Sequence, residues 1–163
     1  MPIKVATTDY RALAELRYRI RLFLREGDAA ARRLGLAPQQ YLLLLAVRGL
    51  PEGAEATIQT LAERLALKHN STVELIDRME SRGYVQRSRN RDDRRCVLVS
   101  LLPRGKKLLE QVARQRITEL RAGGAALVNA IDGLLGRERR SRKRNLSDGL
   151  NQTKRRENNR GQG

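Results

Sequence analysis

The chain is poor in the residues that build metal centres and nucleophilic sites. Its 163 residues include one cysteine, one histidine, one phenylalanine and no tryptophan. A single cysteine excludes an internal disulfide and fits a reducing cytoplasm, and one histidine with one cysteine leaves little for a zinc site. No paired carboxylates, nucleophile with a neighbouring base or glycine-rich phosphate loop stands out. We therefore expect no enzyme activity, no metal and no cofactor.

Long apolar runs are also absent. No run reaches the roughly 18 residues that a membrane-spanning helix needs, and the first ten residues, MPIKVATTDY, contain no apolar signal-peptide core. These features predict a cytoplasmic protein without a membrane partner. Acidic residues are scarce relative to basic ones, 18 against 34, which gives a formal net charge of +16. Such an excess favours a polyanionic partner, with DNA, RNA or an anionic surface as the candidates.

The most informative stretch runs from Thr57 to Leu101. Its first half holds two sets of residues at helical spacing, which are Ile58, Leu61, Ala62 and Leu65, then Thr72, Leu75, Ile76 and Met79. Residues 66–70 between them are too few for a structured loop, so the spacing predicts a helix-turn-helix. Residues 84–89 and 95–101 then read as short strands, joined by the polar, turn-forming residues 90–94. A helix-turn-helix followed by a charged hairpin predicts a winged helix, and a small helical domain with a solvated charged face is the plainer alternative.

The second helix of this motif has a polar face that suits DNA. If Thr72, Leu75, Ile76 and Met79 face inward, the residues that face outward or flank that face are Asn70, Ser71, Glu74, Asp77, Arg78 and Ser81. The start of such a helix enters a major groove, where Asn, Ser and His bond base edges and Glu accepts from cytosine. The hairpin adds long cations suited to phosphates or a narrow minor groove, namely Arg87, Arg89, Arg91, Arg94 and Arg95.

Helical patterns flank this stretch on both sides. Asp9 is expected to cap a helix that runs to about Leu34 and stops at Gly35. A helix this long favours a dimer interface, with a packed helix in a monomer as the alternative. A second helix beginning at Pro38 is apolar almost all round, which predicts a central position in the core. Residues 56–57 are expected to add a short strand to the hairpin and an N-cap at Thr57.

The C-terminal part predicts two more helices and a basic tail. Pro103 opens a long amphipathic helix with its apolar stripe at Leu108, Leu109, Val112, Ala113, Arg116, Ile117 and Leu120. Gly123 and Gly124 break it before a last helix that ends near Leu135. Residues 137–163 hold ten basic and three acidic residues and almost no apolar ones, so we expect disorder and sequence-independent attraction to DNA. An extension without a role is the alternative.

Residues from about Asp9 to Gly136 resemble the MarR family of bacterial winged-helix transcription regulators. The segments LAERLALKHNSTVELIDRMESRGYV and RDDRRCVLVSL, followed by PRG, carry the resemblance. The family's wing signature, Asp-x-Arg before Val-x-Leu-Thr, is met by Asp93, Arg95, Val99 and Leu101, with Leu102 in place of the final Thr. The resemblance implies a mainly α fold with a small β-hairpin wing and long N- and C-terminal dimerisation helices. It also implies a homodimer that binds double-stranded DNA at a pseudo-palindromic operator, more often as a repressor, and that many members release DNA on binding a small phenolic or anionic effector or on cysteine oxidation.

The resemblance also divides the chain and assigns residues. Residues 1–8 are expected to form a disordered N-terminus and residues 137–163 the tail, and the resemblance covers a MarR-like domain over 9–136. Within the domain, the DNA-binding core covers about 37–101, and the dimerisation helices cover about 9–34 and 103–136. The positions that approach DNA are His69, Asn70, Ser71, Val73, Glu74, Arg78, Arg89, Arg91, Arg94 and Arg95, with Asp93 orienting a wing arginine through a salt bridge and Arg82 within reach of phosphates.

Several residues carry alternative interpretations. Cations beside Cys96 favour oxidation of its thiol, but redox-sensing members of the family usually carry their cysteine near the first helix, where this chain has none. His69 at a helix start is more often a polar contact than a metal ligand. Tyr18 and Tyr41 are candidates for an effector pocket, although such residues are more often simply packed. The alternative function is a non-sensing basic architectural nucleic-acid-binding protein that binds through its charge, and either function predicts a cytoplasmic, nucleoid-associated protein.

Overall fold

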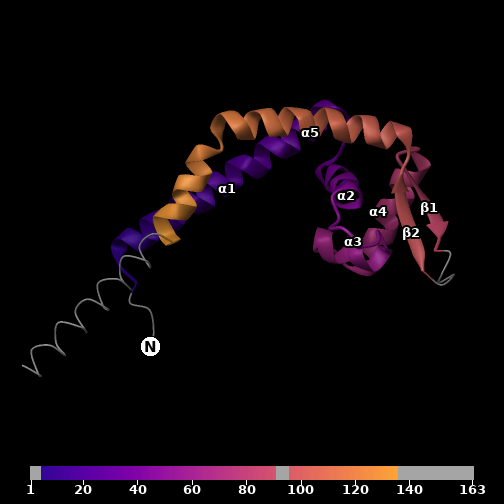
Figure 1. Ribbon diagram of the computed structural model, residues 1–163, viewed down its shortest axis with the longest axis horizontal. Coiled ribbons are helices and arrows are strands. Elements are labelled where there is room, and N and C mark those ends of the chain that lie inside the picture. Colours follow the sequence, from indigo (N-terminus) through magenta and orange to yellow (C-terminus); the bar gives the residue numbers. More distant parts are fainter. Residues whose placement is uncertain (1–4, 91–95, 136–163) are drawn as a thin grey trace, which may run out of the picture. The chain divides into compact units, whose positions relative to one another are not determined.

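The computed structural model describes residues 5–90 and 96–135 and has the predicted mainly α fold with one small hairpin (Figure 1). The helices and strands are α1 (Thr7–Arg33), α2 (Pro38–Arg48), α3 (Ile58–Leu65), α4 (His69–Ser81), β1 (Val85–Arg89), β2 (Val97–Leu101) and α5 (Pro103–Gly123). A further helix covers 125–135. The predicted break at Gly123 and Gly124 is therefore present, whereas the predictions for the tail concern residues outside the described part.

The described residues fall into two compact units. One contains residues 5–22 and 122–135, and the other contains Phe23–Arg121. The second unit holds α2, α3, α4 and the hairpin, together with the C-terminal part of α1 and most of α5. All the residues expected to approach DNA that the structure describes lie in this second unit.

The start of α1 differs from the prediction. The helix begins at Thr7, so residues 7 and 8 are helical, and Asp9 lies inside the first turn. The predicted N-cap at Asp9 is therefore wrong, and from the third position of the helix its Oδ2 accepts a hydrogen bond from the backbone N–H of Ala6 at 2.8 Å. A carboxylate in the first turn is also favourable beside the positive end of the helix dipole. The predicted stop is confirmed, since Gly35 adopts a φ of +74°, a left-handed conformation that suits glycine.

The core of the second unit lies where α2, α3, α4 and the hairpin meet. Pro38 occupies the first turn of α2, as predicted. The largest fully buried side chains are Leu36, Leu43, Leu44, Leu61, Thr72, Ile76, Met79, Val85 and Val112. The predicted central position of α2 in the core is confirmed, since Gln40, Tyr41, Leu43 and Leu44 are buried, although Leu42 and Leu45 are 37% and 41% exposed. The helix packs against α3, α4 and β2, and these contacts leave part of its circumference uncovered.

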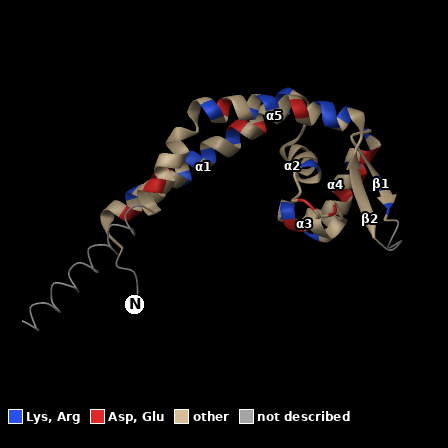
Figure 2. Cartoon of the chain, in the orientation of Figure 1, with Lys and Arg blue, Asp and Glu red and all other residues tan. Residues whose placement is uncertain are grey.

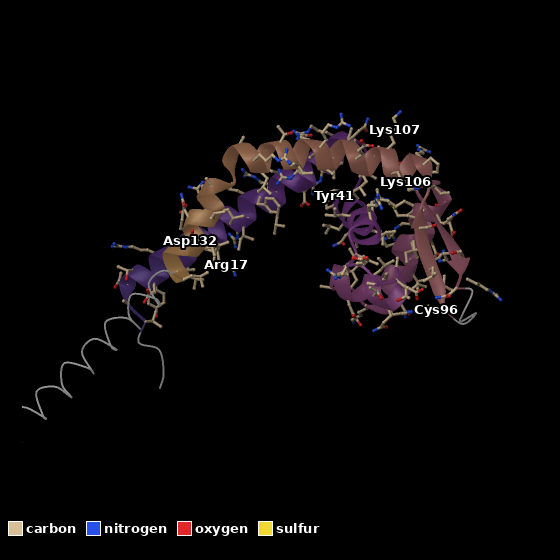
Figure 3. All side chains as sticks on the ribbon, viewed as in Figure 1. Arg17, Tyr41, Cys96, Lys106, Lys107 and Asp132 are labelled. Carbon is tan, nitrogen blue, oxygen red and sulfur yellow. The ribbon has the colours of Figure 1, made fainter. Side chains whose placement is uncertain are left out.

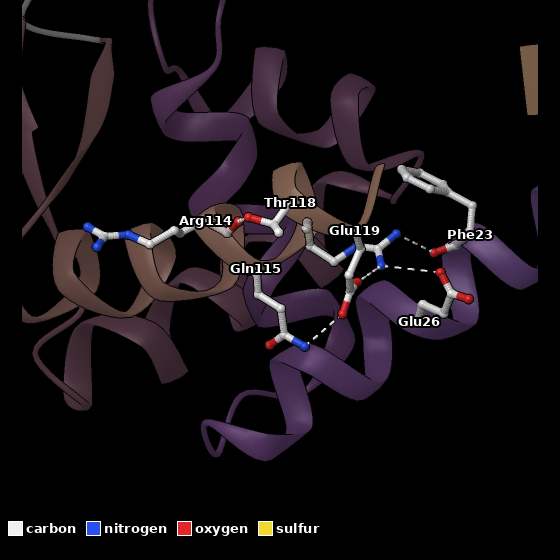
Figure 4. A network of polar contacts seen from close by, with 7 residues as sticks. Phe23, Glu26, Arg114, Gln115, Thr118 and Glu119 are labelled. Atoms are coloured by element: carbon white, nitrogen blue, oxygen red, sulfur yellow. Dashed lines mark hydrogen bonds and ion pairs between the residues drawn. The ribbon is translucent and has the colours of Figure 1, made fainter. Parts of the chain in front are cut away.

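The helix α5 follows the hairpin and carries charges of both signs along its length (Figure 2). Leu109 and Val112 are buried, and one cation on the same stripe, Arg116, is also buried. Arg116 contacts Glu119 on α5 and Phe23 and Glu26 on α1 (Figure 4). A buried guanidinium thus joins α5 to the last turns of α1 within this unit. None of the described helices is long and apolar enough to cross a membrane.

Candidate nucleic-acid interface

The helix α4 buries one face and exposes the other. Thr72, Leu75, Ile76 and Met79 are buried, in agreement with the predicted inward face. The exposed residues of α4 are His69, Asn70, Ser71, Glu74, Asp77, Arg78 and Ser81, and Val73 is half-buried. Four buried anchors therefore hold a helix whose first two turns present polar side chains to the outside.

The turn between α3 and α4 is fixed by backbone hydrogen bonds. After α3 ends at Leu65, Ala66 adopts a left-handed φ of 52°, and the N–H of Leu67 donates to the carbonyl of Ala62 at 3.0 Å. This conformation costs a non-glycine residue about 1–2 kcal/mol, so the surrounding packing must hold it. The hydroxyl of Thr72 donates to the carbonyl of Lys68 at 3.1 Å. The first turn of α4 is thereby held in place while its side chains stay exposed.

The hairpin is tied to the start of α3. Its antiparallel register runs from Val85 opposite Leu101 to Arg89 opposite Val97. The N–H of Val99 donates to the carbonyl of Ala56 at 2.9 Å, and Thr57 forms an isolated bridge with Leu98. The expected extra strand at 56–57 is thus a single bridge. The expected cap at Thr57 is confirmed, because its hydroxyl accepts from the N–H of Thr60 at 3.0 Å.

The structure describes one of the predicted wing cations. Arg89 is exposed at the end of β1. The next residue, Asn90, donates from Nδ2 to both carboxylate oxygens of Glu55 at 2.9 and 3.0 Å, and its N–H donates to the carbonyl of half-buried Cys96 at 2.9 Å. The remaining wing residues of the prediction, Arg91, Asp93, Arg94 and Arg95, lie outside the described residues. What the structure does show is a carboxylate on the loop before α3 that holds the hairpin where β1 ends.

Arg87 contacts α4 through its side chain. It is one of the hairpin cations predicted to suit phosphates, and its guanidinium bonds to Asp77 and Glu80 on α4, each at 2.6 Å. Its side chain is 24% exposed. Burial alone would lower the pKa of Arg87, but hydrogen bonds to Asp77 and Glu80 and their negative charges raise it. Two carboxylates already neutralise this cation, which makes it a poor partner for a phosphate.

Other cations beside α4 are exposed. Arg78 is exposed on α4, and Arg82 follows the helix, where its Nη1 donates to Oε1 of Gln40 at 3.4 Å. Arg104 in the first turn of α5 donates to the carbonyl of Arg82 at 3.2 Å and lies 5.1 Å from the centre of the Tyr84 ring. Sequence reasoning did not single out Arg104, although it lies in the PRG segment directly after the hairpin. Arg78, Arg82 and Arg104 are cations that a backbone phosphate could approach.

A groove of about 490 Å³ lies between the end of α2 and the first half of α5. Its lining combines apolar residues with three charged ones and consists of Leu45, Arg48, Gly49, Leu101, Lys106, Leu109, Glu110 and Ala113. Figure 3 shows Lys106 near the start of α5 and Tyr41 on α2. Neither tyrosine proposed for an effector pocket lines this groove.

The two tyrosines differ in environment. Tyr18 is 53% exposed and lies 5.5 Å from the guanidinium of Arg19. Tyr41 is buried in the core, where burial raises the pKa of its hydroxyl and the nearby charge of Arg116 partly offsets the rise. Within the described ranges, no group of three or more His, Cys, Asp or Glu side chains could hold a metal ion.

The winged helix-turn-helix described above matches one protein family in particular. A model described as the MarR family matches residues 34–95, which include α2, α3, α4 and β1. A Bacillus subtilis protein, the uncharacterised HTH-type transcriptional regulator YsmB, is 30% identical over 106 residues, which cover 65% of this chain and 70% of YsmB. The chain belongs to the MarR family. This MarR-family chain spans about half the length of the next curated relatives that it matches.

Solved structures agree with this assignment. A MarR family protein from Bacillus stearothermophilus is 25% identical, with a TM-score of 0.59 and coverage of 88% of this chain and 96% of that one. An S. aureus MepR mutant bound to an oligodeoxyribonucleotide has 19% identity and a TM-score of 0.53, and the match covers 84% of this chain and 94% of MepR. The helices α3 and α4 are therefore the helix-turn-helix of a MarR-family DNA-binding transcriptional regulator.

Proposed function

We propose that this MarR-family chain binds double-stranded DNA in the cytoplasm as a homodimer and represses transcription from a pseudo-palindromic operator. The observation that carries the proposal is the exposed polar start of α4, held on four buried anchors beside a cationic hairpin. This arrangement suits a helix that enters a major groove while a wing reaches the neighbouring backbone. The S. aureus MepR structure bound to an oligodeoxyribonucleotide shows that a protein of similar fold binds DNA.

The contacts divide between base readout and backbone binding. Asn70, Ser71 and Glu74 lie on the exposed face of α4, and their side chains suit base edges. His69 precedes them in the first turn, and Val73 is less accessible because it is half-buried. The phosphate contacts are assigned to the cations around them, which are Arg78, Arg82, Arg89, Arg91, Arg94 and Arg95, with Asp93 orienting a wing arginine.

The homodimer is assigned to the helices at the two ends of the domain. The dimerisation helices of the proposal cover about residues 9–34 and 103–136, and the DNA-binding core covers about 37–101. Large apolar side chains on α1, α5 and the helix over 125–135 are exposed in the single chain, namely Leu13, Ile20, Phe23, Leu24, Ile117, Leu120, Val128, Ile131 and Leu135. Apolar side chains exposed in such number favour burial against a second copy.

The effector is assigned to the groove between α2 and α5. An apolar floor that includes Leu45 and Leu109 suits a ring or chain, and Arg48 and Lys106 at its border suit an anionic group. A small phenolic carboxylate meets both requirements. The groove lies between α5 and the helix that packs against α4, so a ligand there is positioned to bias the DNA-binding elements.

In vitro selection of bound DNA from the source genome tests the regulator against the architectural alternative. A regulator binds its selected site roughly a thousandfold more tightly than random DNA at the same salt concentration. Asn70→Ala and Ser71→Ala should change which sites are selected. Equal affinity for selected and random DNA would instead identify an architectural protein.

Arginine variants test the assignment of the wing. Arg89→Ala and Arg95→Ala should weaken binding to all sequences. Each should also reduce the slope of the logarithm of the binding constant against the logarithm of the salt concentration by about one unit. Arg114→Ala is a matched control, because Arg114 is exposed on α5 and is not assigned to the interface. An unchanged slope for the wing variants would contradict a backbone role.

The effector is tested separately with phenolic carboxylates such as salicylate and 4-hydroxycinnamate. These compounds should release the selected DNA from the wild-type protein and release it less readily from Lys106→Ala. Sedimentation of the wild-type chain tests the dimer, and a monomer at the concentrations that bind DNA would contradict it.

A further inference from the structure

The side chain of Arg87 connects the hairpin to α4. Its Nη1 donates to Oε2 of Glu80 and its Nη2 contacts Oδ1 of Asp77, both at 2.6 Å. Nη2 also donates to the carbonyl of Val73 at 3.3 Å. The backbone N–H of Arg87 donates to the other carboxylate oxygen of Glu80 at 2.9 Å. One residue of β1 is thus held by three residues along α4.

These bonds fix the orientation of the hairpin relative to α4 as well as its distance from that helix. A planar guanidinium that bonds to two carboxylates accepts a narrow range of orientations. Glu80 receives both the side chain and the backbone N–H of Arg87, so the strand cannot slide or rotate without breaking one of the two bonds. Asp77 and Glu80 follow the residues of α4 assigned to base readout on the same helix. The reading helix and the hairpin therefore behave as one body at this point.

Arg87 also determines where the wing cation at the end of β1 lies. In a strand, residues two apart lie on the same face, about 6.6 Å apart along the chain. Arg89 is two residues beyond Arg87 and exposed, while Arg87 is turned toward α4. Holding Arg87 against α4 therefore places Arg89 at a set position relative to that helix.

We propose that Arg87 is a positioning residue that sets the wing relative to the recognition helix and does not itself bind DNA. The proposal rests on the proposed function, since it assumes that α4 reads bases and that Arg89 reaches the backbone. Without the contacts of Arg87, the wing is free to move and its phosphate contacts become weaker, while base readout by α4 continues.

Substitution of the two carboxylate partners, Asp77 and Glu80, distinguishes a positioning role of Arg87 from a direct contact with phosphate. If Arg87 were a phosphate ligand, Asp77→Asn with Glu80→Gln would release it and strengthen DNA binding. If Arg87 is a positioning residue, the same double variant weakens binding to the selected operator, by about tenfold or 1.4 kcal/mol. Removing negative charge strengthens DNA binding in general, so Glu63→Gln with Glu110→Gln, which also removes two negative charges, is measured as the control. Glu63 accepts a hydrogen bond from Gln59 on α3, and Glu110 pairs with Arg114 on α5.

A double-mutant cycle between Arg87 and Arg89 gives a second measurement. Affinities are measured at 25 °C, where urea unfolding shows each variant to be folded. We expect Arg87→Ala to lower operator affinity about tenfold, and Arg87→Ala with Arg89→Ala to lie within about twofold of Arg87→Ala alone. The free-energy changes of interacting residues are non-additive in this way, whereas those of independent contacts add. Losses that multiply would overturn the proposal, as would tighter binding by the Asp77→Asn, Glu80→Gln variant than by the Glu63→Gln, Glu110→Gln control.

Hydrogen exchange measured without DNA tests the link between the hairpin and α4 independently of the proposed function. Arg87→Ala should speed amide exchange in Val85–Arg89 and Val97–Leu101, with exchange in α2 unchanged. If the wild type lacks sequence specificity, the proposed function fails, while faster hairpin exchange still supports the structural link. Unchanged exchange in the hairpin would refute the positioning role even for a protein that binds its operator specifically.

Discussion

Arg116 on α5 donates from Nη2 to the backbone carbonyl of Phe23 on α1, 3.0 Å away, and its guanidinium lies 4.8 Å from the centre of the Phe23 ring. Nη1 contacts Glu26 at 3.4 Å and also bonds to Glu119 (Figure 4). The side chain of Arg116 is 8% exposed, so its charge would be costly without these partners. A single cation therefore joins α5 to the part of α1 that belongs to the second unit.

We predict that Arg116→Leu lowers the free energy of unfolding by about 1–3 kcal/mol. The loss stays below that for a fully buried ion pair, because Glu26 and Glu119 are 55% and 37% exposed and can be solvated again. Urea unfolding measures the change. Arg114→Leu is the matched control two residues away, where the exposed pair with Glu110 should contribute no more than about 1 kcal/mol. Equal losses for the two variants would contradict a structural role for Arg116.

Glu119 should make stability depend on acid pH. A hydrogen bond from Gln115, followed by the contacts with Arg116, lowers the pKa of Glu119 below its ordinary value of 4.5. A carboxyl whose pKa is lowered by folding stabilises the folded state above its unfolded pKa, and this contribution is lost as the pH falls through the folded value. We therefore predict that Glu119→Gln reduces the loss of unfolding free energy between about pH 5 and 3, as measured by urea unfolding at each pH.

The comparison variant for this prediction is Glu110→Gln, which removes the same charge from an exposed position on α5. Its effect on the pH dependence should be smaller than that of Glu119→Gln. Identical curves for the two variants would show that the bonds from Gln115 and Arg116 do not stabilise the carboxylate.

The winged helix could be predicted from the sequence because its signals are local. Helical spacing places Thr72 and Met79 on the buried face of α4, and Gly35 ends α1 through a backbone conformation that one residue decides. The exposed polar start of α4 followed from the same spacing. In the candidate interface, the residues that faced outward by pattern are the residues that face outward in the structure.

The roles of Arg87 and Arg116 could not be predicted, because they depend on how distant segments pack. Arg87 lies 7 residues from Glu80 in the chain, on a different element, and only the approach of the hairpin to α4 brings them together. Arg116 lies 90 residues from Glu26. One signal was available for Arg116, since it occupies the apolar stripe of α5 with Leu109 and Val112. A cation on such a stripe indicates a buried partner.

The basic tail is open to a direct test although residues 137–163 lie outside the described part. Deleting it removes ten basic and three acidic residues. We predict that the truncated chain remains a dimer in sedimentation and that its affinity falls mainly for random DNA, since this attraction does not depend on sequence. The ratio of specific to random affinity should then rise. A monomer after truncation would show that the dimer interface is not confined to the helices proposed for it.

Gly105 in the first turn of α5 lies directly against the segment that leads into the hairpin. A Cβ built on Gly105 would lie 2.2 Å from the backbone oxygen and 3.0 Å from the carbonyl carbon of Tyr84. That oxygen also accepts a hydrogen bond from the N–H of Leu102 at 3.0 Å, so it cannot move away without breaking the junction between β2 and α5. We predict that Gly105→Ala lowers the free energy of unfolding by about 2 kcal/mol or more.

Gly123→Ala near the end of the same helix is the control, because nothing lies within 4 Å of its Cβ position. There alanine should be neutral or stabilise the helix by up to about 1 kcal/mol, and a Gly105→Ala protein as stable as this control would contradict the close packing of α5 against Tyr84.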